Sequence, residues 1–200
     1  MQLDKNKIYE VGKYTYQNFT TLSEEQVKQI WEWRNHPDIR KYMYNVDEIP
    51  FESHLKFVSG LTDRLDVAYW IVCFKDDPIG IINLTSIDWE HSRAELGYYM
   101  VPEKMNSGLG IDFVYNTILF VFDSLHVSEL FGSIHEDNKN AIILDSYMGC
   151  ELGEVISVDS NSNAKYISWI LNGQKFLENK EGKNNMRNFV RYVKSYNKLC

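Results

Sequence analysis

The chain has 200 residues, of which 44% are hydrophobic and 24% charged, and this composition is typical of one globular domain rather than a disordered or fibrous chain. No apolar run is long enough to span a membrane, and the polar N-terminus predicts no secretory signal. Three cysteines without metal-ligand spacing predict neither a disulfide framework nor a metal site, and favour a cytoplasmic protein. The net charge of −7 argues against a general nucleic-acid-binding protein.

The first half of the chain is expected to form two helices followed by strands. Ser23 and Gln26 have the spacing of a capping box, and the apolar residues after them recur at helical spacing until Pro37. A second helix is expected from Pro50 to about Leu61. Apolar runs separated by turn residues then predict strands at 68–74, 79–84 and 95–101.

In the second half, helices and strands alternate. Apolar residues between Ile111 and Leu125 recur at the spacing of a long helix, and Asn138 can cap another helix that ends at Gly149. Strands are expected at 129–135 and 166–171. The order of elements predicts a mixed α/β domain whose first half is an antiparallel meander.

Residues 1–172 are therefore expected to form one domain, and residues 173–200 a basic extension that is helical at 185–196. The extension carries a net charge of +5, which leaves −12 on the rest of the chain. It can dock on the acidic body, cover a sheet edge, contribute to a homodimer or bind a phosphate-rich ligand.

The segment between the third strand and the long helix is a candidate anion site. It reads Met105-Asn106-Ser107-Gly108-Leu109-Gly110, with two glycines just before the helix. Backbone N–H groups at a helix N-terminus have no intrahelical acceptor, and together with the helix dipole they suit a phosphate or pyrophosphate. A plain tight turn explains the same glycines, and the segment is neither a dinucleotide fingerprint nor a P-loop.

Taken with the order of elements, this segment resembles the GNAT acetyltransferase superfamily over roughly residues 13–171. The family motif is Gln/Arg-x-x-Gly-x-Gly/Ala, and here its first position is Met105. The resemblance implies a GNAT fold with a mostly antiparallel, twisted sheet, and acetyl-CoA as co-substrate without a metal. It also implies that the cofactor contacts the glycine segment and the residues Met100, Val101, Asn138 and Ala141; for Asn138 a plain helix cap is the alternative.

Acetyl transfer to an amine requires a base for the amine and an acid for the departing thiolate. Alternation along the third strand places Glu95 and Tyr99 on one face and Tyr98 on the other. Glu95 lies among apolar residues and is the expected base, directly or through water; a structural ion pair with Arg93 is the alternative. For the acid, the family usually supplies Tyr seven residues after the capping Asn, and that position here is Asp145.

Tyr147 follows two positions later, a swing of about 200° on a regular helix. It is the favoured acid if the helix is bulged or shifted, with Asp145 and solvent as alternatives. No Cys or Ser nucleophile with a matching His is visible, which favours direct attack of the amine over a covalent enzyme intermediate.

The N-terminal third bears on the acceptor. The segment from Trp31 to Met43 contains Trp-Arg-Asn-x-Pro-x-Ile-Arg and resembles a branch of the family that acts in pseudaminic acid biosynthesis. That branch acetylates the 4-amino group of a UDP-linked 4-amino-4,6-dideoxy sugar. The resemblance implies substrate contacts, with the phosphates and the uracil ring, at six positions: Arg34, Met43, Tyr44, His54, Tyr98 and Tyr99.

Two other functions fit the sequence. One is a family member that acetylates a protein N-terminus, a polyamine or an antibiotic, because a cationic acceptor suits an acidic body. The other is an acyl-CoA-binding module without catalysis, which the absence of the usual tyrosine at Asp145 favours.

Overall fold

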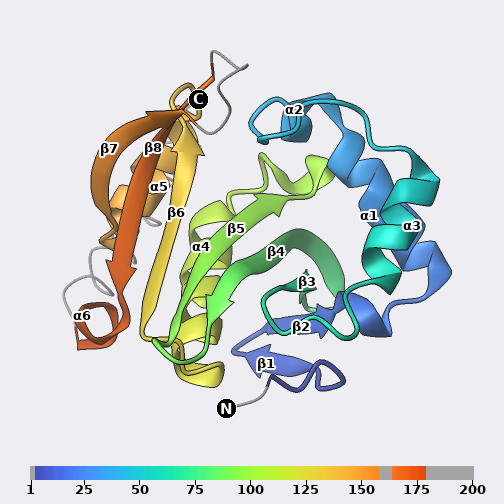
Figure 1. Cartoon of the computed structure of the whole chain (residues 1–200), viewed down its shortest axis with the longest axis horizontal. Coiled ribbons are helices and arrows are strands. Elements are labelled where there is room, and N and C mark those ends of the chain that lie inside the picture. The colour runs from blue at the N-terminus through green and yellow to red at the C-terminus, as the bar shows by residue number, and fades with distance from the viewer. Residues whose placement is uncertain (1–2, 158–163, 179–200) are drawn as a thin grey trace.

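The computed structural model describes residues 3–157 and 164–178, which form an eight-stranded sheet with helices on both faces (Figure 1). The strand order is β1-β2-β3-β4-β5-β6-β8-β7. The strands are β1 (Tyr9–Val11), β2 (Tyr14–Asn18), β3 (Ala68–Phe74), β4 (Asp77–Asp88), β5 (Arg93–Met100), β6 (Glu129–His135), β7 (Glu151–Ser157) and β8 (Lys165–Asn172). The α-helices are α1 (Glu24–Asn35), α2 (Pro37–Arg40), α3 (Phe51–Ser59), α4 (Gly110–Leu119), α5 (Lys139–Met148) and α6 (Gly173–Glu178).

Neighbouring strands are antiparallel except for β5 and β6, which are parallel. Their pairing covers only three positions, from Arg93 opposite Glu129 to Glu95 opposite Phe131. Beyond these pairs the two strands diverge, as the green and yellow arrows of Figure 1 show. Residues 96–100 of β5 therefore have β4 on one side and an open edge on the side of β6.

Two hydrophobic cores lie on opposite faces of this sheet. The larger one packs α4 and α5 against residues such as Trp70, Leu96 and Leu130. The smaller one packs α1, α2 and α3 against Ile71, Ile81 and Val101. Because successive residues of a strand face opposite ways, the predicted strand at 68–74, β3, contributes to both cores and is buried on both faces.

The helix boundaries follow local chemistry. Ser23 accepts a hydrogen bond from the N–H of Gln26, whose side chain accepts one from the N–H of Ser23, so the predicted capping box is present at α1. Pro37 does end α1, but it opens the short helix α2, where a missing N–H is tolerated. The predicted helix from Ile111 to Leu125 is split: α4 ends at Leu119, and residues 120–124 form a π-helical turn, η3.

The start of the predicted basic extension packs on the body. Phe176 of α6 is buried, with its ring 5.6 Å from that of Tyr115 and 5.7 Å from that of Phe122. The predicted helix at 185–196 lies outside the described residues. The division at residue 172 therefore stays a prediction.

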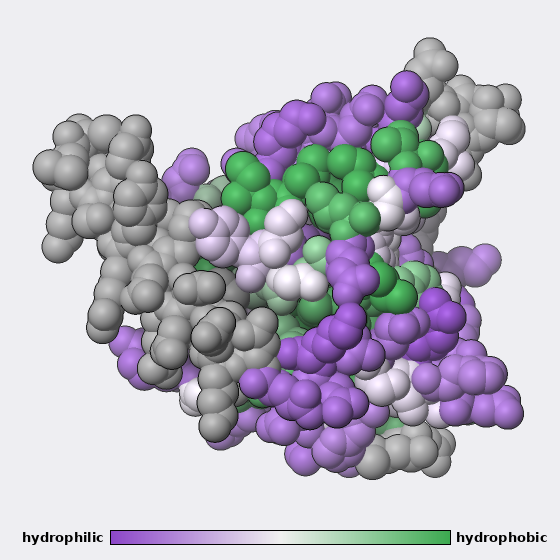
Figure 2. All heavy atoms as spheres, turned by 90° about the vertical axis from the view of Figure 1, so that its left-hand side faces the viewer, coloured by the Kyte–Doolittle hydropathy of each residue, from purple (hydrophilic) through white to green (hydrophobic). Residues whose placement is uncertain are grey.

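The edge of the sheet formed by β7 exposes apolar side chains. Leu152, Val155 and Ile156 of β7 are exposed, as is Ile143 on α5, and Figure 2 shows hydrophobic side chains gathered on this side of the molecule. In the part of the chain that the structure describes, no helix is long and apolar enough to cross a membrane. A homodimer stays a prediction.

Candidate active site

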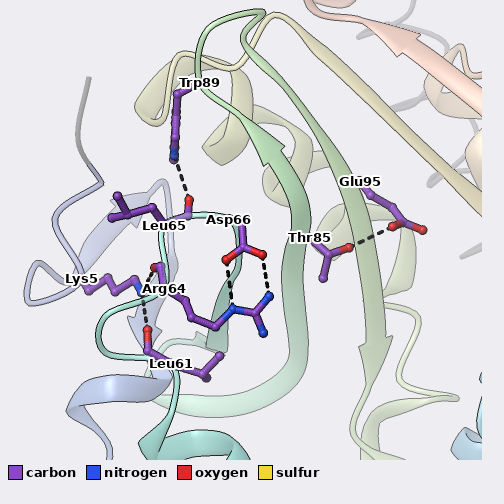
Figure 3. Close-up of polar contacts among 8 residues, drawn as sticks. All are labelled: Lys5, Leu61, Arg64, Leu65, Asp66, Thr85, Trp89 and Glu95. Carbon is purple, nitrogen blue, oxygen red and sulfur yellow. Dashed lines mark hydrogen bonds and ion pairs between the residues drawn. The ribbon is translucent and has the colours of Figure 1, made fainter.

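Glu95 lies at the point where β5 and β6 part. It belongs to the last pair of the parallel ladder, opposite Phe131, and is half-buried. The hydroxyl of Thr85 on β4 donates a hydrogen bond to its Oε2 at 3.0 Å, a contact drawn in Figure 3. Arg93, the expected partner in a purely structural role, instead pairs with Glu129 at 3.5 Å. A hydroxyl, and not a cation, thus holds the carboxylate at the point where β5 and β6 part.

Tyr44 reaches this carboxylate from the segment that follows α2. Its hydroxyl donates to Oε1 of Glu95 at 3.3 Å and lies 2.5 Å from Oγ of Ser133 on β6. Tyr44 as a whole is 54% exposed, and its ring packs edge-on against Tyr166 of β8, at 4.9 Å between centroids. The hydroxyl therefore connects β5 to β6 across the divergence. Neighbouring Met43, packed against the smaller core, accepts a hydrogen bond from Tyr166 through its carbonyl.

Arg34, near the end of α1, brings a partly buried positive charge to the same face. Its Nη2 donates to the carbonyl of Asn45 at 3.1 Å, but Nη1 is buried without a hydrogen-bond partner. Burial lowers the pKa of the guanidinium, while the phenols of Tyr99 and Tyr69 favour its charge. Among residues 3–157 and 164–178, no carboxylate forms an ion pair with it. A buried cation without an anion is costly, so this group is suited to an anionic ligand.

His54 occupies a different kind of place. It lies on α3 with only 5% of its surface exposed, and the burial lowers the pKa of its imidazole, which a backbone hydrogen bond with Val27 of α1 partly offsets. Nε2 is buried without a partner in the described chain. His54 thus packs between α3 and α1, and its burial leaves little of the imidazole accessible for a direct phosphate contact. Arg34 is close enough to disfavour the charged imidazole.

A second polar pair lies on the other face of β5. Tyr98 donates a hydrogen bond from its hydroxyl to Oδ1 of Asp145 on α5, at 2.5 Å. Asp145 is only 3% exposed, and this burial raises the pKa of its carboxyl to about 7, although the hydrogen bond from Tyr98 opposes the shift. Burial, reinforced by the charge of Asp145, raises the pKa of Tyr98 well above 10. Tyr98 therefore faces α5, away from the face that carries Arg34 and Glu95.

Tyr147 points elsewhere. α5 is an uninterrupted α-helix from Lys139 to Met148, so residues two positions apart lie on roughly opposite sides of it. Accordingly, Tyr147 is 45% exposed, whereas Asp145 is buried. The bulge that would turn Tyr147 inward is absent from this helix. The structure thus brings Asp145, and not Tyr147, onto β5.

The glycine segment lies at the start of α4, as predicted. Residues 105–108 are exposed, and no side chain caps the helix, whose first N–H groups are left without an intrahelical acceptor. Gly108 has φ +76°, the left-handed region that favours glycine. Gly110 faces Met100 at the end of β5, whose sulfur would lie 3.4 Å from an added Cβ. This geometry suits a phosphate group, and it joins the segment to the open edge of β5.

Asn138 is a helix cap in this structure. Its side-chain oxygen accepts a hydrogen bond from the N–H of Ala141 at 3.2 Å, which satisfies one free donor at the start of α5. The cap and a cofactor contact are compatible, because α5 follows β6 on the far side of the opening.

The sequence does not single out two residues of the site. Thr85 and Ser133 are the hydroxyls that hold Glu95 and Tyr44, and both come from strands that the sequence predicts only as hydrophobic runs. The sequence signal that could indicate them is a polar residue on the same face of the sheet as Glu95. Many exposed strand positions have such a residue, so the signal is not specific.

Comparisons with known proteins identify the family and the fold. Residues 18–146 match the family model described as an acetyltransferase (GNAT) domain. Two curated relatives from Campylobacter jejuni strains, each named acetyltransferase PseH, are 32% identical over 127 residues, which are 64% of this chain and 78% of theirs.

Solved structures show the same fold. The crystal structure of C. jejuni PseH with acetyl coenzyme A is 23% identical, with a TM-score of 0.62 over 80% of this chain and 98% of that one. A Vibrio cholerae spermidine N-acetyltransferase with CoA and spermine has a TM-score of 0.74 at 15% identity, over 83% of this chain and 99% of that one.

Proposed function

Since the chain belongs to the GNAT acetyltransferase family, we propose that it transfers acetyl from acetyl-CoA to the 4-amino group of a UDP-linked 4-amino-4,6-dideoxy sugar. The observation that carries the choice of acceptor is Arg34. Its buried, unpaired Nη1 lies on the face of β5 that also carries Glu95, where an acceptor amine would meet its base. The negative pyrophosphate of a nucleotide sugar supplies the missing anion.

The two ends of the acceptor fit two parts of the site. The diphosphate would lie near Arg34, whose charge Tyr99 and Tyr69 also face, and the exposed ring of Tyr44 offers a surface for the uracil. The amine would then reach Glu95, which takes its proton directly or through water. The similarity to PseH, at 32% identity, supports a sugar amine as the acceptor. It agrees with the resemblance of the N-terminal third to the pseudaminic acid branch of the family.

The donor fits the other side of the opening. The free N–H groups at the start of α4 would hold the pyrophosphate of acetyl-CoA, and its pantetheine arm would follow the open edge of β5 through Met100 and Val101. The thioester would reach the amine between β5 and β6. The PseH structure with acetyl coenzyme A supports this donor.

Direct attack is the mechanism that the described nucleophiles favour. Burial raises the pKa of both Cys73 and Cys150, so neither thiol is activated for a covalent intermediate. A double-reciprocal plot of rate against both substrates should give intersecting lines. Parallel lines, or a trapped acetyl-enzyme, would contradict direct attack.

A cationic acceptor is the second candidate. The spermidine N-acetyltransferase has a similar fold, and a net charge of −7 attracts polyamines. An unpaired Arg34 at the acceptor site disfavours a polycation, because the like charges would repel at close range.

The direct test is mass spectrometry of UDP-4-amino-4,6-dideoxy-N-acetyl-altrosamine incubated with the protein and acetyl-CoA, with free thiol followed in parallel. We expect the sugar to gain one acetyl group with an equal release of CoA, and spermidine to gain none. Acetylated spermidine with unchanged sugar would reject the proposed acceptor and leave the family assignment standing.

Substituting Arg34 tests the anionic contact. Arg34→Ala should raise KM for the nucleotide sugar about 10- to 100-fold, with a smaller change in kcat, because a charge-assisted pair with phosphate is lost from a partly buried position. The matched control is Arg64→Ala, which removes an exposed arginine paired with Asp66 and should leave KM unchanged. Steady-state kinetics at varied sugar concentration provides both values, and an unchanged KM in Arg34→Ala would contradict the contact.

A further inference from the structure

A tyrosine–aspartate pair lies on the opposite face of β5 from Glu95. Glu95 and Tyr98 are three residues apart on one strand, so their side chains face opposite ways. Glu95 contacts Thr85 and Tyr44, whereas Tyr98 contacts Asp145. The amine and the thiolate therefore have separate proton-carrying groups, one on each side of the sheet.

Tyr98 is placed at the open part of β5. It lies three residues beyond the last β5–β6 pair and two residues before Met100, which faces Gly110 of the glycine segment. Phe113 of α4 packs edge-on against its ring at 6.2 Å between centroids. Its hydroxyl crosses the gap to Asp145, on the helix that follows β6. A pantetheine arm that ran from the glycine segment along this edge, as proposed above, would pass Tyr98.

Asp145 is arranged to hold a proton. It is 3% exposed, Tyr98 is its hydrogen-bond partner through the side chain, and in the part of the chain that the structure describes no cation pairs with it. Burial raises the pKa of the carboxyl to about 7, so the acid and its carboxylate coexist near neutral pH. The titratable groups that face it are Tyr98 from β5 and Cys150 just after α5.

The state of Asp145 controls the acidity of Tyr98. The negative charge of Asp145 is one cause of the high pKa of this phenol. When the carboxyl is protonated, that charge is absent, and the carboxyl can donate a hydrogen bond to the phenol oxygen. Tyr98 is then a better acid than an isolated buried tyrosine.

We propose that Tyr98 protonates the departing CoA thiolate and that Asp145 is the positioning residue that holds Tyr98 and replaces its proton. This proposal rests on the proposed acetyl transfer. The amine nitrogen bonds to the acyl carbon, and the carbon–sulfur bond breaks with its electron pair going to sulfur. The phenolic proton of Tyr98 goes to sulfur, the carboxyl proton of Asp145 goes to the phenolate, and Glu95 takes the proton of the amine. Solvent then returns a proton to Asp145 and removes one from Glu95.

In this proposal the chain keeps a tyrosine hydroxyl for the thiolate, although Asp145 occupies the position where most family members have tyrosine. The tyrosine hydroxyl comes from β5, and the helix supplies the carboxyl that holds it. This arrangement removes the main sequence argument for a non-catalytic module, which was the presence of Asp145 in place of tyrosine.

The test compares Tyr98→Phe and Asp145→Asn with the unmodified protein. Tyr98→Phe should lower kcat for thiol release about 100-fold with little change in KM for acetyl-CoA, because only proton transfer is removed. The control is Tyr14→Phe, which deletes a similar tyrosine–aspartate hydrogen bond, to Asp112 at 2.6 Å, and should keep kcat within a few-fold.

The pH profile separates this role from a structural one. In the unmodified protein kcat should fall as pH rises above about 7, when Asp145 loses its proton, and Asp145→Asn should lack this limb because an amide does not titrate. A buried pair that only stabilises the fold would leave the limb in place. An unchanged limb in Asp145→Asn, or a kcat in Tyr98→Phe within about three-fold of normal, would overturn the proposal.

Failure of the proposed acceptor is distinguishable from failure of this inference. The measurement uses whichever acceptor the unmodified protein acetylates, and with none it uses the slow hydrolysis of acetyl-CoA, which releases the same thiolate. If Tyr98→Phe does not fold, as judged by its thermal transition and CoA binding, Asp145→Asn alone decides, since it keeps a hydrogen-bond acceptor for Tyr98.

Discussion

At the scale of single residues, the surroundings of Glu95 determine what it can do. The carboxylate accepts hydrogen bonds from two hydroxyls, those of Thr85 and Tyr44, and among the described residues no lysine or arginine forms an ion pair with it. The two hydroxyls fix the orientation of the carboxylate at the point where β5 and β6 part. Among the described residues Glu95 is thus not half of a structural ion pair, which supports the base role proposed for it.

Replacing Glu95 by Gln should therefore impair turnover and spare cofactor binding. We expect Glu95→Gln to lower kcat by about 10²- to 10⁴-fold, the usual contribution of a general base, with the Kd for CoA unchanged. The matched control is Glu129→Gln, which removes a carboxylate on the neighbouring strand that pairs with Arg93. Steady-state assays of thiol release provide kcat, and calorimetric titration with CoA provides its Kd. Normal turnover in Glu95→Gln would assign the base role to another group.

At the scale of elements, α5 depends on its cap. Asn138→Ala removes the acceptor for the N–H of Ala141 and should lower the free energy of unfolding by about 1 kcal/mol. Asn138→Asp keeps the acceptor and should retain most of that stability. Urea denaturation of the three proteins measures the difference, and equal midpoints would show that the cap contributes nothing. If the Asp variant is stable but binds CoA more weakly, the amide also contacts the cofactor, as the family resemblance implies.

The sequence predicts most elements that carry a strong apolar period. The strands at 68–74 and 129–135 and the helix capped by Asn138 are confirmed within one or two residues. No separate strand is predicted at β1 or β7, because β1 has only three residues and the apolar residues of β7 do not alternate. β2 does alternate, with Tyr14 and Tyr16 buried, but its five residues are mostly polar or aromatic and give a weak signal.

The site is predictable only where one element determines it. Alternation along β5 correctly separates Glu95 from Tyr98, because a strand's period is local. The contacts of Tyr44 with Glu95 and Ser133 join residues 51 and 89 positions apart, and only the divergence of β5 from β6 brings them together. The orientation of Asp145 toward Tyr98 likewise depends on how α5 packs on the sheet, which no local pattern contains.

At the scale of the whole molecule, Asp145 links stability to pH. Burial raises the pKa of its carboxyl from 3.8 to about 7 in the folded chain, whereas the unfolded chain keeps the ordinary value. Between these two values the folded state binds more protons than the unfolded state, so the free energy of unfolding falls as pH rises. Below about pH 4 the contribution is complete, and above about pH 7 it has been lost.

Comparing the unmodified protein with Asp145→Asn isolates this contribution, because all other titrating groups are shared. The stability of the unmodified protein relative to Asp145→Asn should fall by a few kcal/mol, on the order of 1.4 kcal/mol per unit of pKa shift, between pH 4 and pH 7. Urea unfolding at pH 4, 5, 6, 7 and 8 measures this difference, with Asp112→Asn as the control for the same substitution at an exposed aspartate that also accepts a hydrogen bond from a tyrosine. Parallel stability curves for the unmodified protein and Asp145→Asn would mean that folding does not raise the pKa of Asp145. The carboxyl would then be deprotonated near neutral pH and could not supply the proton that Tyr98 is proposed to receive.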